Sequence, residues 1–252
     1  MVKYDKKELV ATLVNAWKGN GLVNAELASD LSPGSLLEAY EIQKLLGIQM
    51  EWWPNGRPSA WKLVGERELA APVPDRFIIP SPSVIKKNSL FSLCGIEVEI
   101  IVRLSRELLG GCSDRDVRNS IDGVFSAIEI FDVRVEDWRN VPDNFLLADL
   151  QMHGKLVLGD GVLNEWNKSL YGTELDILVN GLSLDKGLFR HPMGDPLAMI
   201  PWLASHAEKR GWPLQKGDMI ATGSWSKMFE INPGDVVQAF FKDIGGVSVF
   251  LE

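Results

Sequence analysis

The spacing of hydrophobic residues changes near residue 55 of this 252-residue chain. Before that point they recur every three or four positions, as in Leu9 and Leu13, which is typical of amphipathic helices. Asp5 is placed to cap the first helix, and Ser32-Pro33 is placed to open a second one. We therefore predict a helical cap over residues 1–55 whose hydrophobic faces pack on the rest of the chain.

After residue 55, short runs rich in β-branched and aromatic residues are separated by glycine and proline. The predicted strands are 60–64, 96–104, 128–135, 154–158, 174–179, 218–221, 236–241 and 247–251. Helices are expected to begin at Ser113 and at Asp195, and Pro201 should kink the second of them. This order of elements predicts an α+β protein in which residues 56–252 form a β-rich, mixed-sheet roll.

The predicted strand over residues 96–104 carries an acidic pair. Glu97 and Glu99 lie two positions apart, so a strand sends both carboxylates to one face and its hydrophobic residues to the other. A third acid, Glu129, lies in a similarly hydrophobic run further along the chain. The pair alone suits a solvated sheet face, but carboxylates in such surroundings are costly to bury without a cation. The three acids together favour a metal site.

The ligand types restrict the metal. All three acids are oxygen ligands with no His or Cys beside them in the sequence, which favours Mg²⁺ or Mn²⁺ over zinc. Asp132 competes with Glu129, although a strand over residues 128–135 would turn the two to opposite faces. Lys62 lies on a predicted strand among hydrophobic neighbours, so it is either a desolvated proton donor and acceptor or an ordinary surface lysine.

Composition excludes several classes of protein. The net charge of −8 and the lack of a basic cluster argue against a nucleic-acid partner. Two cysteines, Cys94 and Cys112, are too few for a disulfide framework and too far apart for a CxxC site. The sequence shows no signal-peptide pattern and no hydrophobic run long enough to span a bilayer. We expect a soluble cytoplasmic protein with no membrane partner.

Three segments in order resemble one enzyme family. They are Ala60-Trp61-Lys62-Leu63-Val64-Gly65, Glu97-Val98-Glu99 and residues 127–134. They are similar to the lysine strand, the paired metal ligands and the third-ligand segment of the 2-oxopent-4-enoate hydratases and oxalocrotonate decarboxylases of the fumarylacetoacetate hydrolase superfamily. Further similar segments lie at residues 39–43, 148–149, 156–159, 194–197, 214–224 and 233–235.

This resemblance implies a fumarylacetoacetate hydrolase-like fold, with a small helical region on a β-rich metal-binding catalytic domain. The implied activity is that of a metal-dependent lyase, a hydratase that adds water to a 2-hydroxy-2,4-dienoate and gives a 4-hydroxy-2-oxo acid during aromatic-compound catabolism. A homo-oligomer acting on this small molecule is expected. The alternatives are decarboxylation of a 2-oxo diacid, C–C bond hydrolysis, and a binding or partner subunit that has lost the chemistry.

The same resemblance implies roles for individual residues. The implied ligands of Mg²⁺ or Mn²⁺ are Glu97, Glu99 and Glu129. Lys62 and Asp75 are the implied catalytic residues, with Lys62 moving protons as the dienol becomes a ketone. The implied hydrogen-bond donors to the substrate are Thr222 and Ser224.

The chain also departs from the family pattern at three places. Two residues separate Lys62 from Gly65, whereas the family has one residue between its lysine and the next glycine. The chain then continues Glu66-Arg67-Glu68, whereas the family continues Leu-Thr-Ser. Pro74-Asp75-Arg76-Phe77 matches the family's Pro-Asp-(Tyr/Phe)-Gly only in part. After Asp149 the family has Asn and small residues, and this chain has Leu150-Gln151-Met152-His153. These changes lie where the substrate is expected.

Overall fold

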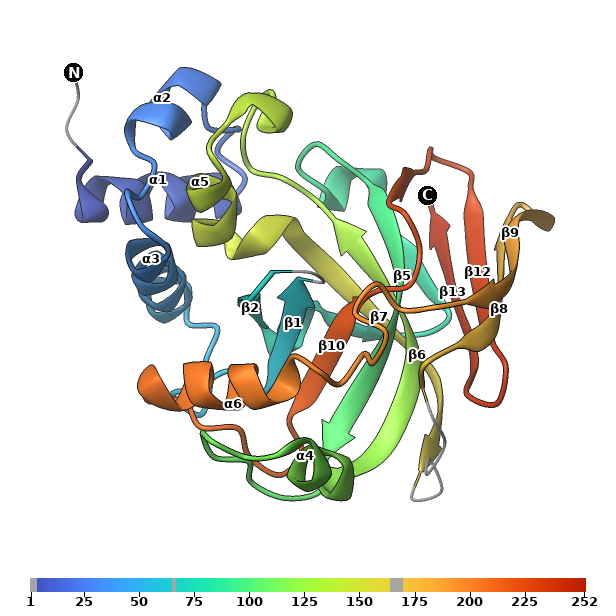
Figure 1. The fold of residues 1–252 in the computed structure, drawn as a ribbon. Helices are drawn as coiled ribbons and strands as arrows, with labels where there is room; N and C mark the ends of the chain where they lie inside the picture. The colour runs from blue at the N-terminus through green and yellow to red at the C-terminus, as the bar shows by residue number, and fades with distance from the viewer. Residues whose placement is uncertain (1–3, 65–66, 164–169) are drawn as a thin grey trace.

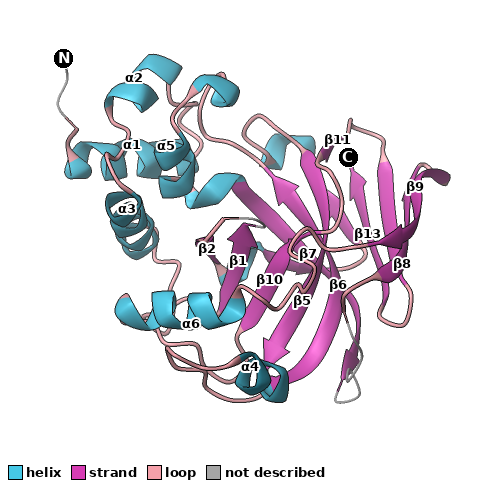
Figure 2. Cartoon of the chain, viewed as in Figure 1, coloured by secondary structure: helices cyan, strands magenta, loops and turns pink. Residues whose placement is uncertain are grey.

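The structure, a computed structural model, describes residues 4–64, 67–163 and 170–252. Within those residues the strands form two sheets, and most helices gather along one side of the sheet body (Figures 1 and 2). No described helix combines the length and hydrophobicity that a membrane crossing requires. Gly65 and Glu66, part of the first departure noted above, lie outside the described residues.

The N-terminal region is helical, as predicted, with α1 (Lys6–Trp17), α2 (Ala25–Asp30) and α3 (Leu36–Gln49). The Asp5 carboxylate caps α1 by accepting the Lys7 backbone N–H. The predicted start of α3 at Ser32-Pro33 is wrong. Ser35 caps it instead, because its hydroxyl accepts the backbone N–H of Glu38 and pairs with the Glu38 carboxylate.

The later helices are α4 (Asp114–Ser120), α5 (Asp143–Ala148) and α6 (Ile200–Lys209). Helix α4 begins after Ser113, as predicted, and the structure adds a capping box between Ser113 and Asp116; α5 was not predicted. The prediction for α6 is wrong in two respects. The helix begins after Met199 instead of at Asp195, and Pro201 lies in its first turn, where proline does not kink a helix.

The first sheet has the strand order β2-β1-β10-β5-β6-β7-β3, with β11 paired to β5. Its strands are β1 (Ala60–Val64), β2 (Leu69–Val73), β3 (Ile78–Pro80), β5 (Gly95–Leu104), β6 (Ile121–Phe131), β7 (His153–Leu163), β10 (Met219–Ser224) and β11 (Phe229–Glu230). β1 pairs with β10 and β3 with β7 in parallel, whereas β5 is antiparallel to both of its neighbours, β6 and β10. The sheet is therefore mixed, and the predicted α+β class is confirmed.

The second sheet has the order β4-β13-β12-β8-β9 and packs against the first through β13, which contacts β6 and β7. Its strands are β4 (Ser83–Ile85), β8 (Thr173–Val179), β9 (Leu182–Phe189), β12 (Val236–Phe241) and β13 (Gly245–Leu251). The sheets approach closely at Gly159 of β7, where an added Cβ would lie 2.5 Å from the Gly246 carbonyl oxygen. Glycine is required at such a point of backbone contact.

The strand predicted over residues 128–135 is wrong at both ends, because β6 runs from Ile121 to Phe131. The chain leaves the sheet at Asp132, whose carboxylate accepts the backbone N–H groups of Phe91, Ser92 and Leu93 at 2.7–3.1 Å. Strands β2 and β3 were not predicted. Each carries a proline and lies at an edge of the sheet, where proline costs no ladder hydrogen bond.

The alternation predicted for β5 is confirmed. Ile96, Val98 and Ile100 are fully buried in the main hydrophobic core, which also contains residues of the N-terminal helices and of both sheets. The opposite face of β5 carries Glu97 and Glu99. This face of the first sheet holds the candidate site.

Candidate metal and active site

Register in the first sheet brings the three acids together. Glu97 of β5 lies directly opposite Glu129 of β6, and Glu99 follows two residues along β5. One carboxylate oxygen of each residue lies within 4.8 Å of the others. Glu99 and Glu129 are each 1% exposed, so the cluster is a buried group of acids and not a solvated sheet face. Asp132 lies beyond the end of β6 and is engaged by backbone amides.

Crowding and burial disfavour three negative charges at this place. Burial, together with the nearby Glu129 carboxylate, raises the pKa of Glu97 to about 7. The pKa of Glu99 lies well above its ordinary range because the residue is buried and because Glu129 and Glu97 are close. A bound divalent cation would supply the positive charge that this arrangement lacks.

Lys62 of β1 lies against the same cluster. Its Nζ atom is 2.6 Å from Glu129 Oε1, donates to the Gln151 carbonyl at 3.1 Å, and lies 4.3 Å from the centroid of the Phe131 ring. The side chain is 2% exposed, which excludes the surface-lysine alternative. Burial alone would raise the pKa of Glu129, but Lys62 and His153 hold that pKa below its ordinary value.

His153 is a site residue that sequence reasoning missed. It is fully buried at the start of β7, and its Nδ1 atom lies 2.9 Å from Glu129 Oε1. Burial lowers the pKa of His153, so the neutral ring donates its Nδ1–H to the carboxylate. The available signal was the departure from the family pattern after Asp149, which places a histidine among residues expected to be small.

The donor atoms fit a divalent cation. Glu129 Oε1 is occupied by Lys62 and His153, while Oε2 of Glu129 and Oε2 of Glu99 are buried and accept no hydrogen bond from any described residue. Buried carboxylate oxygens without partners are costly. An all-oxygen set of this kind suits hard cations such as Mg²⁺, Mn²⁺ or Ca²⁺.

These side chains surround a cavity of about 380 Å³, which we call the carboxylate cavity. Its lining includes Lys62, Glu97, Glu99, Glu129, Phe131 and Ser224. The Ser224 hydroxyl donates to the Ser226 carbonyl at 2.6 Å and also contacts Glu97, whose pKa it lowers. The cavity therefore combines the acid cluster, a buried ammonium group and a hydroxyl.

Two residues expected in the site do not line this cavity in the described part of the chain. Thr222 is buried, and its hydroxyl donates to the Ile100 carbonyl at 2.9 Å. Asp75 is exposed in a short 3-10 turn (Asp75–Phe77), where its carboxylate accepts a hydrogen bond from Ser59. Their catalytic and binding roles remain predictions.

One wall of the cavity is a left-handed turn. Leu150, Gln151 and Met152 have φ values of 52°, 54° and 59°, a conformation that costs about 1–2 kcal/mol for each residue with a Cβ. Gln151 and Met152 line the cavity, and the Gln151 carbonyl accepts a hydrogen bond from Lys62 Nζ. Strain of this size persists only where surrounding contacts hold the backbone.

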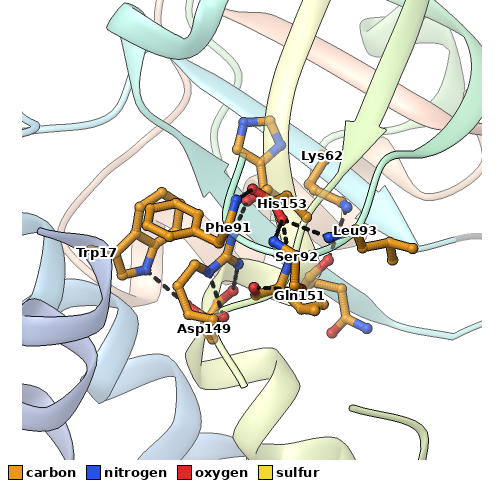
Figure 3. Close-up of polar contacts among 11 residues, drawn as sticks. Trp17, Lys62, Phe91, Ser92, Leu93, Asp149, Gln151 and His153 are labelled. Atoms are coloured by element: carbon orange, nitrogen blue, oxygen red, sulfur yellow. Dashed lines mark hydrogen bonds and ion pairs between the residues drawn. The ribbon is translucent and has the colours of Figure 1, made fainter. Parts of the chain in front are cut away.

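A buried ion pair holds this turn (Figure 3). Arg134 Nε donates to Asp149 Oδ2 at 2.7 Å, and its two terminal nitrogens donate to the backbone carbonyls of His153 and Asp149. Trp17, at the end of α1, donates from Nε1 to Asp149 Oδ1 at 2.7 Å. These bonds fix both ends of the turn and connect it to the helical cap.

Comparison with known proteins identifies the family. The sequence model of the family described as Fumarylacetoacetate (FAA) hydrolase C-terminal matches residues 56–249. The chain belongs to this family, whose members named below are enzymes. The predicted resemblance to hydratases and decarboxylases of the family is confirmed.

Relatives with assigned activities are distant. A 2-keto-4-pentenoate hydratase of Paraburkholderia xenovorans (strain LB400) is 28% identical over 158 residues, which is 62% of this chain and 58% of that protein's length. A 2-keto-4-pentenoate hydratase 1 of Dechloromonas aromatica (strain RCB) is 24% identical over 256 residues, with 96% of this chain and 95% of that protein covered. A 4-oxalocrotonate decarboxylase of Pseudomonas putida is 24% identical over 240 residues and 88% of both chains.

A solved structure supports the fold. The 4-oxalocrotonate decarboxylase from Pseudomonas putida G7, complexed with magnesium and adipate, aligns over 100% of both chains with a TM-score of 0.86 and 22% identity. A second structure of that protein is complexed with calcium and acetate. The fumarylacetoacetate hydrolase-like fold predicted for this chain is thereby confirmed.

Proposed function

We propose that this protein is a divalent-metal-dependent hydratase that adds water to a 2-hydroxy-2,4-dienoate and gives a 4-hydroxy-2-oxo acid. The observation that carries the proposal is the cluster of three carboxylates within 4.8 Å, beside buried Lys62 in one cavity. The relatives named 2-keto-4-pentenoate hydratase support it. The reaction is that of a hydro-lyase.

Glu97, Glu99 and Glu129 would hold the cation. A bound Mg²⁺ or Mn²⁺ would stabilise negative charge on the carboxylate and 2-oxygen of the substrate. His153 holds Glu129 through Oε1, and Oε2 of Glu129, which accepts no hydrogen bond from any described residue, would be available to the cation. The Ser224 hydroxyl lies on the cavity wall and would donate to the substrate by exchanging its hydrogen bond to the Ser226 carbonyl for one to the substrate.

Lys62 would move the protons. Conversion of the dienol to the 2-oxo form removes a proton from the 2-hydroxyl oxygen and adds one at C5, after which water adds at C4. Lys62 Nζ lies in the carboxylate cavity, is shielded from solvent, and is held by Glu129 and the Gln151 carbonyl. A group held in this way can carry a proton between substrate atoms with little reorganisation.

The alternatives share the cation and the lysine. Decarboxylation of a 2-oxo diacid is supported by the relative named 4-oxalocrotonate decarboxylase. A binding or partner subunit would keep the metal site without turnover.

An assay of the purified protein with 2-hydroxypenta-2,4-dienoate, with and without Mg²⁺ or Mn²⁺, distinguishes these candidate functions. The proposal expects loss of dienoate absorbance and formation of 4-hydroxy-2-oxopentanoate, with neither seen in Glu99→Gln. Release of CO₂ from an oxalocrotonate without hydration would establish the decarboxylase instead. Metal binding by calorimetry with no turnover of either compound would support the partner subunit. Sedimentation velocity would test the expected homo-oligomer.

A further inference from the structure

A second cavity adjoins the carboxylate cavity. It has a volume of about 630 Å³ and shares Arg67, Gln151 and Met152 with the first as lining residues. The remaining walls are mostly hydrophobic or aromatic and include Leu36, Tyr40, Leu69, Leu146, Leu147 and Trp202. We call this the apolar cavity.

The wall between the two cavities consists of long, unbranched side chains. Gln151 and Met152 extend from the left-handed turn, whose backbone the Arg134–Asp149 pair holds in place. Such side chains change rotamer at little cost, and methionine in particular adapts to different neighbours. The Gln151 Oε1 atom is buried and accepts no hydrogen bond from any described residue, so the wall also offers one unused acceptor. Rotamer changes of these side chains would let a ligand extend from one cavity to the other while the backbone of the turn stays in place.

Charge determines which ligand end suits the apolar cavity. Among the described residues, its charged lining residues are Arg67, Glu68 and Asp143. Arg67 pairs with Asp143 at 3.0 Å on the exposed rim, so Glu68 leaves the described part of the lining with one net negative charge. A carboxylate entering this cavity would meet that charge and lose hydration against hydrophobic walls. A hydrocarbon group gains from the same burial.

We propose that the apolar cavity binds a hydrocarbon tail attached at C5 of the dienoate, while the carboxylate end of the substrate lies in the carboxylate cavity. The position of that carboxylate end rests on the proposed function. The substrate class is thus a monocarboxylic 2-hydroxy-2,4-dienoate with an extended alkyl or aryl substituent, and not a diacid.

Binding of saturated 2-oxo acids tests the tail site without requiring turnover. In calorimetry with Mg²⁺ present, 2-oxononanoate should bind about 10- to 100-fold more tightly than 2-oxopentanoate, because four further methylene groups leave water. The diacid 2-oxononanedioate should bind more weakly than 2-oxononanoate. Equal affinity for the two monoacids, or tighter binding of the diacid, would overturn the proposal.

Two neighbouring residues of α3 provide a matched pair of variants. Leu36 lines the apolar cavity and is 48% exposed, whereas Leu37 is 62% exposed and is not among the described lining residues. Leu36→Glu should abolish the preference for 2-oxononanoate and leave 2-oxopentanoate binding unchanged. Leu37→Glu should bind both as the wild type does. If both variants keep the preference, the tail lies elsewhere and the proposal fails.

Turnover separates failure of the tail site from failure of the proposed function. With 2-hydroxynona-2,4-dienoate, kcat/KM should exceed that for 2-hydroxypenta-2,4-dienoate in the wild type and in Leu37→Glu, but not in Leu36→Glu. If neither dienoate is hydrated and the 2-oxononanoate preference persists, the result supports the tail site and refutes the proposed function. If Leu36→Glu alone changes the sedimentation coefficient, the cavity is a contact between copies of the chain, and the tail proposal is overturned.

Discussion

Trp17 and Asp149 are 132 residues apart in sequence, and yet the indole Nε1–H of one donates to the buried carboxylate of the other at 2.7 Å. The same carboxylate pairs with Arg134, whose guanidinium also lies 4.0 Å from the centroid of the Trp17 ring. The helical cap thus contributes directly to the support of the turn that forms one wall of the site (Figure 3).

Trp17→Phe should therefore lower the free energy of unfolding by more than the smaller ring alone would. Removing the indole N–H leaves one Asp149 oxygen without its donor in a buried position, at a cost of about 1–3 kcal/mol in the free energy of unfolding. KM for the dienoate should also rise, because the turn carrying Gln151 loosens. Urea unfolding and steady-state kinetics measure the two effects.

Trp52→Phe is the matched control for this change. Trp52 is buried beside Trp17, and its indole N–H has no acceptor among the described residues. Its replacement should lower the free energy of unfolding only through the lost packing contacts, and it should leave KM unchanged. Equal effects of the two substitutions on KM would show that the Trp17–Asp149 bond does not position the turn.

Lys62→Met should lower kcat by about 10²–10⁴-fold, because the group that carries the proton is lost. It should also reduce stability in the absence of metal, by about 3–5 kcal/mol, since Glu129 would lose its cationic partner in a buried site. Mn²⁺ affinity should persist, because the three carboxylates remain.

Lys62→Arg separates charge from proton transfer. Guanidinium keeps the positive charge beside Glu129 but does not release a proton near neutral pH. Turnover should stay low while Mn²⁺ still binds and thermal melts show a folded protein. Wild-type turnover in this variant would mean that Lys62 supplies only charge, and Asp75 would be the next residue to test.

Two acids near the end of β6 should behave differently toward metal. Glu129→Gln should abolish Mn²⁺ binding in calorimetry, because it removes ligand charge from the cluster. Asp132→Asn should keep Mn²⁺ affinity and instead lower the melting temperature, because its carboxylate accepts the backbone N–H groups of Phe91 and Leu93. The reverse pattern would make Asp132 the ligand.

His206 should make the fold sensitive to mild acid. Burial, with a contribution from Arg210, lowers its pKa from 6.5 to about 3, and Arg210 Nε–H donates to the neutral ring. A lowered folded-state pKa means that the stabilisation is complete above pH 6.5 and is lost as the pH falls toward 3. Between pH 7.5 and pH 5 the free energy of unfolding of the wild type should fall by about 1–2 kcal/mol more than that of His206→Gln, whose side chain does not titrate. Urea unfolding at both pH values measures this difference, and parallel losses would refute it.

The sequence alone determined some local features of this protein, although it misplaced the starts of α3 and α6 and both ends of β6. Period-2 alternation on β5 correctly placed Glu97 and Glu99 on one face, since a strand turns each successive side chain to the opposite side. The cap at Asp5 and the helix start at Ser113 were likewise predicted, because side-chain-to-backbone bonds over two or three residues need no distant partner. Hydrophobic neighbours left Lys62 open between a buried and a surface lysine, and the structure decided for burial.

The tertiary structure decided every relationship that depends on register or packing. Glu129 lies opposite Glu97 only because β6 pairs with β5 in one register, and a shift by one residue would turn it to the other face. Three further features join segments far apart in the chain. They are the contact of His153 with Glu129, the hydrogen bonds from backbone amides to Asp132, and the cavity behind Gln151. No local pattern encodes such contacts, because they arise when whole strands and helices pack together.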